Sequence, residues 1–525
     1  MMKKLLCVLM SAFMLIAACA CGNNPADNSN SGGGNSSSDE ITVTEGYTVH
    51  EIEAGSGYEV GGYGAQIDTD QFMPFNNLTD EERTMLKTRI SEMNVQYTRI
   101  KMFGEYFEMA NDNDDPNVFD YDAAGVFFDS TEMKALYEVL DLCEENGIKV
   151  DLSWYNCNST FKAYDQTDEN GKLYQGTWMG YSFDETNTWC TAPRMTETFD
   201  GYAEQAENIA VCLDYLINKK NYTCIYGFSF IAEGFYSPNG IVWDEYVRCC
   251  DVINKRLIKD GLKDKVIFIG TSNESKNMKM FEELQTPLKD IFDIGGFGLY
   301  HWDLSDLKTN RYTQADYFEN LKAVCDRLGY DNFAVPEFCT HNRHSLNATT
   351  WDDVEDYDAA LWHATLVIDA AKYGFTTLNH YIIGDTYFTN SYVHTMGLWM
   401  YRDNGWKAHP AYYVWAMVCK YTDVGAKVYN IDFDREKDVM TMAFLLPEGG
   451  WTYLAVNFGD KTEKVAFVNQ NENKPGKVNL YRLTESAIPE NRVCETPDKY
   501  DEENGSDGVV YLKLSPMSLT VVSTR

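Results

Sequence analysis

Short apolar runs alternate with amphipathic helical patterns eight times in the central part of the chain. The runs are bounded by turn-forming residues, as expected for strands that are covered on both faces. Strands that alternate with helices pair in parallel, and eight such units close into a barrel. We therefore predict an α/β fold with a (β/α)8 barrel, whose strands cover residues 60–68, 95–102, 148–154, 224–231, 266–271, 294–301, 332–338 and 375–382.

Helix-boundary signals support this alternation. Thr79 and Glu82 have the spacing of a capping box, and an apolar stripe follows them. Ser130 begins another helical pattern, which ends at Asn146 and Gly147, where glycine suits a left-handed cap. Further helices are predicted over residues 199–216, 243–262, 314–328, 359–373 and 408–421.

The pattern changes after Tyr421 to short alternating runs separated by Gly, Asn, Asp and Pro. Such spacing is typical of an antiparallel β-sandwich, so a second domain is predicted after the barrel. Residues 41–48 also alternate like a strand and are expected to pair with this domain. The C-terminal strands are predicted over residues 439–446, 452–458, 464–468, 477–483 and 518–523.

The first residues have the layout of a secretory signal. Two lysines precede an apolar run that ends at Ala18 and is too short to span a bilayer. The sequence IAAC at 16–19 resembles a bacterial lipobox, which predicts cleavage before Cys19 and lipid attachment to its sulfur. Cys21 is a weaker candidate, and an ordinary signal peptide is the alternative. The polar residues up to Ser38 are predicted to form a flexible tether.

These patterns predict a protein on the extracellular face of a bacterial membrane, touching the membrane only through the lipid on Cys19. The predicted organisation is a lipoprotein signal peptide (1–18), a tether (19–40), an N-terminal strand segment (41–58), the barrel (59–422) and the sandwich (423–525).

Composition narrows the possible partners. The formal net charge of −36 disfavours nucleic acid and anionic membrane surfaces. Aromatic residues make up 14% of the chain, which fits sugar stacking, although aromatics more often fill cores. No metal-ligand spacing occurs, so neither a metal nor another cofactor is expected. The acidic run Asp112–Asp115 lacks the glycine and distal glutamate of a calcium loop and is predicted to be a solvated loop.

The cysteines show no disulfide framework. Cys157 and Cys190 fall in one long polar segment, residues 155–194, and form the one pair to test. The length and aromatic content of that segment favour a substrate-contacting loop. Buried free thiols are predicted for the cysteines in apolar patterns, namely Cys212, Cys224, Cys249 and Cys325.

Two of the predicted strands end in a single carboxylate. Glu337 lies in NFAVPEF at 332–338, and Glu233 follows CIYGFSFI at 224–231. Because the carboxyl ends of barrel strands form one face, the two acids are expected to face each other across a pocket. Two opposed carboxyls are the minimum equipment for hydrolysing a glycosidic bond, since one protonates the leaving oxygen and the other attacks the anomeric carbon or activates water.

Alternatives to this pair remain open. A lone acid after a strand is more often the start of a surface loop, and the repetition of the pattern is what favours a pocket. Glu274, after the fifth strand, is a rival that a helix start would explain equally well. Arg99 on the second strand and Tyr300 and His301 on the sixth are expected near the pocket mouth.

With these residues in view, the chain resembles clan A glycoside hydrolases, in outline families 30, 39 and 51, which join a (β/α)8 TIM barrel to a β-sandwich. The resemblance covers roughly residues 60–525 and rests more on the order of elements than on shared words. The matching motifs are IAEG (231–234), VPEF (335–338), YTRIK (97–101), LYHW (299–302), NGWKAHPAYYVWAMV (404–418) and LSPMSLTVV (514–522).

The resemblance implies a retaining glycosidase that acts on a β-linked carbohydrate. Glu233 would be the acid/base and Glu337 the nucleophile, with their carboxyl groups ~5–5.5 Å apart. Arg99, with Tyr300 or His301, would hold the nucleophile ionised and oriented. Trp154 and Tyr381 would form walls of the sugar subsite. Core packing is the alternative for these aromatic residues, and a barrel histidine without substrate contact is the alternative for His301.

One departure from the clan pattern bears on activity. The clan usually has Asn before the acid/base, where this chain has Ala232, so one hydrogen bond to the sugar is missing unless another residue supplies it. A catalytically silent glycan-binding lipoprotein is therefore the alternative function, while a transporter's solute-binding protein is disfavoured by the terminal sandwich. Four basic residues could accept a uronic acid or pair with local acids, namely Arg99, Lys101, Arg194 and Arg343.

Overall fold

The structure is a computed structural model, in which residues 43–525 form one compact unit. It describes residues 42–52, 55–102, 128–155, 166–167, 173–174, 181–183, 189–191, 201–231, 243–270, 278–300, 307–339, 354–389, 392–429 and 438–525.

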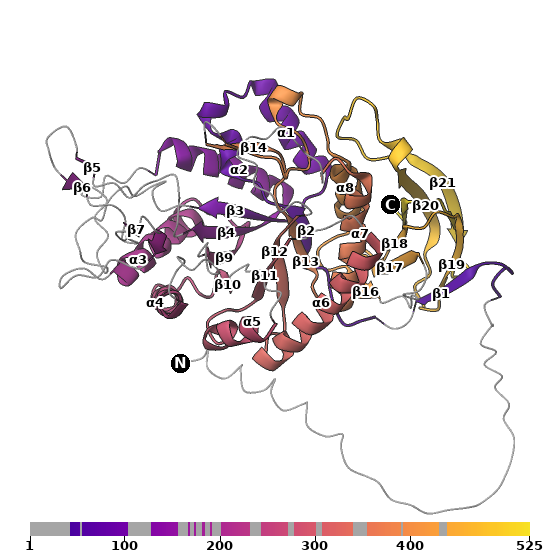
Figure 1. Ribbon diagram of the computed structural model, residues 1–525, viewed down its shortest axis with the longest axis horizontal. Coiled ribbons are helices and arrows are strands. Elements are labelled where there is room, and N and C mark those ends of the chain that lie inside the picture. The colour runs from indigo at the N-terminus through magenta and orange to yellow at the C-terminus, as the bar shows by residue number, and fades with distance from the viewer. Residues whose placement is uncertain are drawn as a thin grey trace, which may run out of the picture. The chain divides into compact units, whose positions relative to one another are not determined.

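Eight parallel strands follow one another around a barrel in sequence order (Figure 1). The ring closes because Ile269 forms a parallel bridge with Ile294, and the Gly270 amide donates to the Ile294 carbonyl at 2.9 Å. The predicted (β/α)8 barrel is thus confirmed, and each expected strand overlaps an observed one. The strands are β2 (Gly62–Ala65), β3 (Tyr97–Met102), β4 (Lys149–Tyr155), β9 (Ile225–Ile231), β10 (Ile267–Ile269), β11 (Gly295–Tyr300), β12 (Phe333–Cys339) and β13 (Thr377–His380).

A helix follows each barrel strand and covers the outside of the sheet (Figure 1). These helices are α1 (Asp80–Glu92), α2 (Thr131–Asn146), α3 (Gly201–Asp214), α4 (Trp243–Lys259), α5 (Met278–Gln285), α6 (Leu307–Leu328), α7 (Tyr357–Lys372) and α8 (Pro410–Lys420). A π-helical turn, η4 (Tyr215–Lys219), extends α3, and short 3₁₀ turns are η1 (Thr69–Phe72), η2 (Pro74–Asn76), η5 (Thr286–Leu288), η6 (Arg402–Asn404) and η7 (Glu485–Ala487).

The expected helix caps are present. The Thr79 hydroxyl accepts from the Glu82 amide at 3.2 Å, and the Glu82 carboxylate accepts in return from the Thr79 amide at 2.9 Å. The Ser130 hydroxyl accepts from the Met133 amide, and Gly147 closes α2 at φ 66°. Local sequence therefore sets the limits of these helices, while burial of their apolar faces supplies most of their stability.

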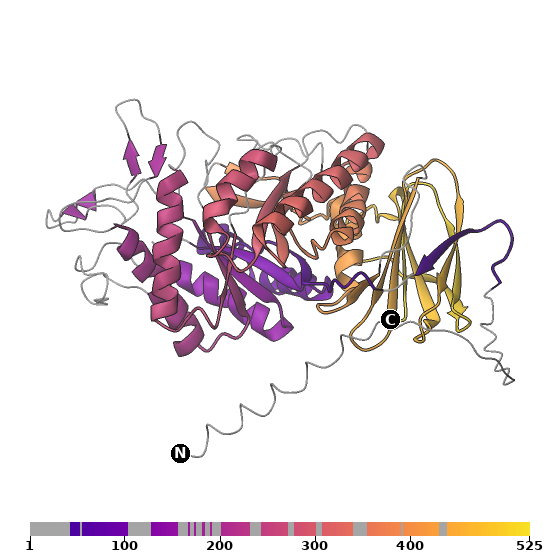
Figure 2. The same ribbon diagram turned by 90° about the horizontal axis from the view of Figure 1, so that it is seen from below.

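The C-terminal strands form a sandwich of two sheets (Figure 2). Tyr453 of one sheet stacks on Phe467 of the other with centroids 5.0 Å apart, so the apolar faces meet. The six-stranded sheet has the order β16 (Lys427–Tyr429), β17 (Val439–Leu445), β18 (Trp451–Asn457), β23 (Ser518–Ser523), β20 (Gly476–Thr484) and β21 (Lys499–Gly505), and the three-stranded sheet has the order β1 (Thr48–Ile52), β19 (Glu463–Asn469) and β22 (Val509–Leu514).

The N-terminal strand joins the sandwich as predicted but begins later than predicted. The strand is β1, at 48–52 instead of 41–48, and it pairs with β19 in parallel. The other neighbouring strands of the sandwich are antiparallel, so the predicted sandwich is confirmed with this one exception.

Small hairpins accompany the main elements in the described parts of the chain. Two of them lie in the long polar segment predicted as a loop, and a third follows the last barrel strand. They pair β5 (Gln166–Thr167) with β6 (Leu173–Tyr174), β7 (Tyr181–Phe183) with β8 (Trp189–Thr191), and β14 (Thr386–Thr389) with β15 (Tyr392–His394).

Aromatic side chains join the barrel to the sandwich. Tyr63 of β2 packs against Trp415 of α8 and Phe444 of β17, with ring centroids 6.1 and 6.4 Å away. The Trp415 indole also donates to the Gly64 carbonyl at 2.9 Å. One hydrophobic cluster consequently runs from the barrel into the sandwich. The predicted buried free thiols are confirmed at Cys212, Cys224, Cys249 and Cys325.

Gly64 offers a test of how closely the first two barrel strands pack. A Cβ there would lie 1.9 Å from the Tyr97 carbonyl oxygen, and that contact is with backbone. We expect Gly64→Ala to lower the free energy of unfolding by more than ~3 kcal/mol, because the strands must separate. Gly261→Ala is the control: its Cβ meets nothing within 4 Å and costs only the left-handed strain at φ +68°, about 1–2 kcal/mol. Urea unfolding measures both, and equal losses would contradict the packing argument.

Candidate active site

Glu337 is the partly exposed residue of an otherwise buried strand. It is the fifth residue of β12, whose other members are all buried, and its side chain is 19% exposed. The strand runs between β11 and β13, so both edges are hydrogen-bonded and the backbone is fixed. The rigid strand therefore supports a single carboxylate with limited access to solvent, as the sequence predicted for strand seven.

Arg99 of β3 forms a charge-assisted hydrogen bond with Glu337. Its Nη2 donates to Oε2 of the carboxylate, and the Arg99 side chain is fully buried. Its Nε donates to the Gln66 side chain at 2.8 Å, and the Gln66 amide donates in turn to Asp68 at 2.8 Å. Gln66 thus orients the guanidinium. The structure brings Arg99 of the second strand to Glu337 of the seventh, as the sequence predicted.

A second carboxylate lies beside Arg99 inside the barrel. Asp151 of β4 is fully buried and accepts hydrogen bonds from the Ser229 hydroxyl at 3.0 and 3.1 Å and from the Tyr97 hydroxyl at 3.4 Å. Burial raises the pKa of Asp151 to about 6, against the opposing effects of the Arg99 charge and the hydroxyl donors. Arg99 therefore stabilises negative charge on two separate strands, β12 and β4.

Lys101 lies two residues after Arg99, on the same face of β3, and contacts Tyr381. The Lys101 ammonium donates to the Tyr381 hydroxyl at 3.0 Å and lies 3.8 Å from an Asp68 carboxylate oxygen. The Tyr381 amide donates to the Phe338 carbonyl at 2.8 Å. Tyr381, which follows the last barrel strand, is thereby held beside the residue that follows Glu337.

Trp154 lies in the hydrophobic core. Its side chain is fully buried and packs edge-to-face on Phe228 at 6.1 Å. Side chains alternate along a strand, and its neighbour Ser153 contacts Ser229 inside the barrel at 2.5 Å. Trp154 therefore faces the helix layer, which supports the core-packing alternative over a sugar-binding wall.

Several predicted site residues lie wholly or partly outside the described part of the chain. Tyr300 ends β11, where its backbone pairs with Cys339 of β12, as expected for strand six. Its side chain is not among those the structure describes. Glu233 would follow β9, which ends at Ile231. The predictions for Glu233, Ala232, His301, Glu274 and Cys19, and for the Asp112–Asp115 run and the pairing of Cys157 with Cys190, fall outside the described residues.

Sequence reasoning missed Gln66, Asp68 and Asp151, which surround Arg99 and Lys101. The signal for the first two was available, because Gly64, Gln66 and Asp68 alternate along one face of the first strand. Asp70 was also missed: burial of its carboxyl, with the nearby charge of Asp68, raises its pKa to about 7, although Lys101 opposes the shift. This group of acids engages both described cations, so Arg99 and Lys101 pair with local acids.

Neither a cluster of metal-binding side chains nor a membrane-spanning helix is found among the described residues. None of their His, Cys, Asp and Glu side chains gather in a set of three or more able to hold a metal ion. Within the same residues, no helix has the length and apolar character needed to cross a membrane.

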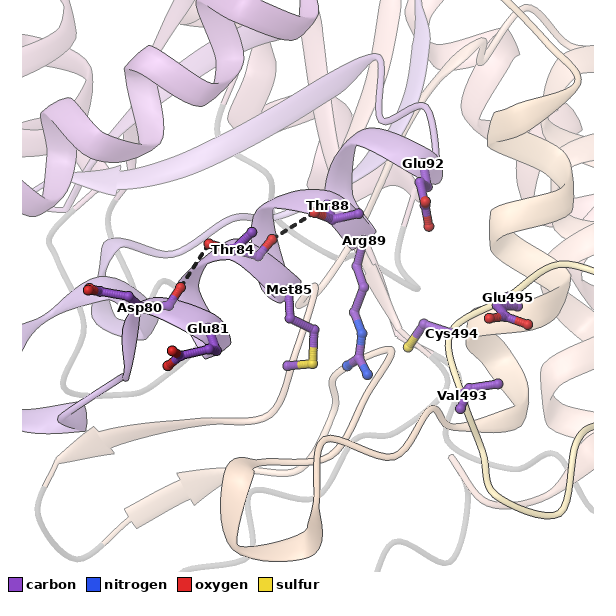
Figure 3. Close-up of a pocket in the computed structure, with 10 residues that line it drawn as sticks. All are labelled: Asp80, Glu81, Thr84, Met85, Thr88, Arg89, Glu92, Val493, Cys494 and Glu495. Atoms are coloured by element: carbon purple, nitrogen blue, oxygen red, sulfur yellow. Dashed lines mark hydrogen bonds between the residues drawn. The ribbon is translucent and has the colours of Figure 1, made fainter.

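A separate groove of about 590 Å³ lies on the outer layer (Figure 3). Met85 and Arg89 of α1 form one side, and the sandwich loop at Cys494 forms the other. None of its lining residues comes from a barrel strand, so the groove is distinct from the Arg99–Glu337 site.

The comparisons with solved structures agree with the fold. The chain is similar to the catalytic domain of a GH30 xylanase C from Talaromyces cellulolyticus (TM-score 0.60, 13% identity, covering 91% of this chain and 99% of that one). It is also similar to a GH30 endoxylanase from Clostridium papyrosolvens (0.58, 13%, 90% and 98%) and to an α-L-arabinofuranosidase from Thermotoga maritima (0.58, 12%, 90% and 98%).

These similarities extend over nearly the whole chain, from the barrel through the sandwich. No protein-family model and no curated protein matches the sequence. At such low identity the likeness establishes the fold alone. The resemblance to clan A glycoside hydrolases expected from the sequence is confirmed at that level.

The ion pair between Arg99 and Glu337 predicts that removing the cation alone destabilises the fold more than removing the cation and the Glu337 charge together. Arg99→Met keeps the volume but leaves Glu337 and Asp151 without their shared cation, so we expect the free energy of unfolding to fall by about 3–5 kcal/mol. Adding Glu337→Gln should recover part of that loss, because one of the stranded charges disappears.

The control for this experiment is Arg327→Met, which breaks the exposed ion pair between Arg327 and Glu282 and should change stability little. Urea denaturation of the four chains gives the comparison. A double variant no more stable than Arg99→Met alone would contradict an energetic link between Arg99 and Glu337.

Proposed function

We propose that the protein is a retaining glycoside hydrolase that cleaves β-linked glycans. The observation that carries the proposal is the buried Arg99 hydrogen-bonded to Glu337 at the carboxyl end of the seventh strand. In a (β/α)8 barrel this end of the strands is where catalytic side chains lie. A carboxylate held ionised by a buried guanidinium is equipped to act as a nucleophile, and only weakly as a proton donor.

The proposed reaction has two displacements. The Glu337 carboxylate attacks the anomeric carbon while Glu233 gives its proton to the leaving oxygen, so the glycosidic bond breaks and a glycosyl-enzyme ester forms. Glu233 then takes a proton from water, whose oxygen attacks the anomeric carbon and releases Glu337 as a carboxylate. Arg99 stabilises the charge on Glu337 before the first step and after the second.

The surroundings of Glu337 favour a neutral sugar. Arg99 and Lys101, the described cations of this part of the barrel, already contact carboxylates, so accepting a uronate would require breaking an existing pair. Tyr381 offers an aromatic ring beside them, with the Lys101 ammonium 4.9 Å from the ring centroid. We assign Tyr381 to the sugar subsite, together with Tyr300 and His301 as the sequence motifs suggest.

The solved structures name different substrates, including xylan and α-L-arabinofuranosides, and another similar chain is an endo-β1,6-glucanase (TM-score 0.55, 11% identity). The shared fold therefore leaves the sugar open. A test of activity must span several neutral sugars, for which aryl β-xyloside, β-glucoside, β-galactoside and α-L-arabinofuranoside form a suitable panel.

Glu337→Gln is the decisive variant. It keeps the shape of the side chain but removes the nucleophile, so we expect kcat on any cleaved glycoside to fall at least ~10³-fold. Glu319→Gln, an exposed change on α6, is the matched control and should leave kcat unchanged.

A 2-deoxy-2-fluoro glycoside of the same sugar should form an ester with wild-type Glu337, detected by mass spectrometry of the digested protein. An active Glu337→Gln, or label on another carboxylate, would refute the assignment.

The alternative function is a catalytically silent glycan-binding protein, motivated by Ala232. Wild-type inactivity across the panel together with retained glycan binding would favour it. In that case neither the wild type nor Glu337→Gln should hydrolyse any glycoside of the panel, and the two should bind glycan with similar affinity.

We also propose that the protein is tethered to a bacterial membrane on its extracellular face through lipid on Cys19. The lipobox-like IAAC and the polar segment after it support this proposal. Expressed in a bacterial host with labelled palmitate, the wild-type chain should carry label and sediment with membranes, whereas Cys19→Ser should do neither. Cys21→Ser is the control, and loss of label in that variant alone would move the anchor to Cys21.

A further inference from the structure

A buried ionic cluster connects the sandwich with the segment that follows the last barrel strand. His409, directly before α8, has a fully buried side chain. Its Nδ1 lies 2.6 Å from a Glu355 carboxylate oxygen, and its Nε2 lies 3.4 Å from an Asp385 carboxylate oxygen. Glu355 precedes α7 and Asp385 follows β13, so three separate parts of the barrel meet at one imidazole.

The geometry requires a charged ring. A carboxylate is an acceptor only, and both ring nitrogens of histidine are donors only in the imidazolium form. Although burial opposes the charge, hydrogen bonds and charges from Asp385 and Glu355 raise the pKa of His409 to about 9. Burial likewise opposes ionisation of Glu355, but His409 and Arg492 hold the pKa of that carboxyl below its usual range.

The sandwich contributes the fourth charge of this cluster. Arg492, in the loop between β20 and β21, donates to the other Glu355 oxygen at 3.0 Å. Its Nη1 donates to the Ala408 carbonyl at 3.2 Å, and the Ala408 amide donates to the Arg492 carbonyl at 2.8 Å. His380 is another titratable neighbour, and its pKa is lowered first by burial and further by the charges of His363 and His409.

On the barrel side, Asp385 anchors the segment that begins at Tyr381. Its carboxylate accepts from the Gly397 amide at 2.8 Å, and its own amide donates to the Trp399 carbonyl at 2.8 Å. The contact is close, because a Cβ on Gly397 would lie 2.1 Å from the Asp385 nitrogen. The His409 amide also donates to the Leu398 carbonyl at 2.9 Å, so His409 holds both sides of this contact.

The anchored segment leads directly to the site. The Ile383 amide donates to the Gln66 carbonyl at 2.9 Å, and Gln66 orients Arg99 through its side chain. Two residues earlier, Tyr381 is hydrogen-bonded to the Phe338 carbonyl and to Lys101. Displacing the segment would therefore move Tyr381 relative to Glu337.

We propose that charged His409 is a positioning residue that fixes Tyr381 beside Glu337, and that Arg492 makes the sandwich a working part of the site. The claim about catalysis rests on the proposed function, since it takes Tyr381 as a wall of the sugar subsite. The structural claim, that the cluster fixes the segment from Tyr381 to Asp385, stands without it.

The sign of the pH dependence follows from the raised pKa. His409 gains its proton more readily in the folded chain than in the unfolded one, so its contribution is complete below the unfolded pKa of about 6.5. It is lost as the pH rises through about 9. The segment should consequently be held most firmly below about pH 6.5 and loosen progressively as the pH rises to about 9.

Hydrogen exchange of the amides of Ile383, Asp385 and Leu398 tests the structural claim. After correction for intrinsic rates, we expect wild-type protection to be greatest at pH 6, to fall progressively above that pH and to be at least ~10-fold lower by pH 10. In His409→Gln, protection should be low at every pH and show no step. If His409→Gln does not fold, the pH dependence of wild-type protection is still a sufficient test. Wild-type protection that stays unchanged from pH 6 to pH 10 would overturn the proposal.

Arg492 tests the part played by the sandwich. At pH 7, Arg492→Gln should speed exchange of the same three amides, and Arg492→Lys should restore most of their protection. Arg482→Gln is the control, because Arg482 also lies in the sandwich but bonds to Tyr500 and the Lys513 carbonyl instead. Equal exchange in Arg492→Gln and Arg482→Gln would refute the role of the sandwich.

Kinetics separates this proposal from the proposed function. On a glycoside that the wild type cleaves, Arg492→Gln should raise KM about 3–10-fold with a smaller change in kcat, as expected when a binding wall shifts. Unchanged KM together with faster exchange would refute the catalytic claim. Inactivity of the wild type would refute the proposed function, while the exchange measurements would still decide whether the cluster positions the segment.

Discussion

The hydrogen bond between Arg99 and Glu337 is the interaction on which the candidate site depends. A guanidinium with no solvent exposure has lost its hydration, a cost of several kcal/mol that opposite charge and hydrogen bonds must offset. Glu337 supplies the charge at the mouth, Asp151 supplies charge deeper in the barrel, and Gln66 supplies a neutral acceptor. Arg99 is thus held between two carboxylates and a neutral acceptor, and its hydrogen bond to Oε2 orients the Glu337 side chain.

The barrel makes this arrangement possible because its strands hold the hydrogen-bond donors and acceptors at fixed spacing. Tyr97, Arg99 and Lys101 alternate along β3 and reach three successive levels of the interior. The lowest contacts Asp151, the middle one contacts Glu337, and the highest contacts Tyr381 and Asp68. The polar groups that contact Asp151, Glu337 and Tyr381 thus come from a single strand.

Much of this organisation could be predicted from the sequence, because it is local. The strands of the barrel are short apolar runs, the helices carry their own caps, and Glu337 is the single acid of its strand. The side toward which Trp154 points could not be predicted with the same method. Its direction depends on the register of β4, and a shift of one residue exchanges interior and helix-facing positions.

Other features escaped prediction because they depend on distant pairs. β1 lies a few residues later than its alternating pattern suggested, since its limits are set by pairing with β19 far along the chain. Glu355, Asp385, His409 and Arg492 have no common motif, and only the packing of the sandwich against the barrel brings them together. Polar networks of this kind are selected by three-dimensional neighbours, which leave little trace in local periodicity.

The sandwich is therefore more than an appendage in the energetics of this chain. Tyr63 and Trp415 join its hydrophobic core to that of the barrel. Arg492 gives Glu355 a second positively charged partner beside His409. A buried histidine between two carboxylates carries one positive charge against two negative ones, so the fourth group balances the cluster. Because the neutralising charge comes from the sandwich, correct docking of that domain and correct geometry after the eighth strand depend on the same set of contacts.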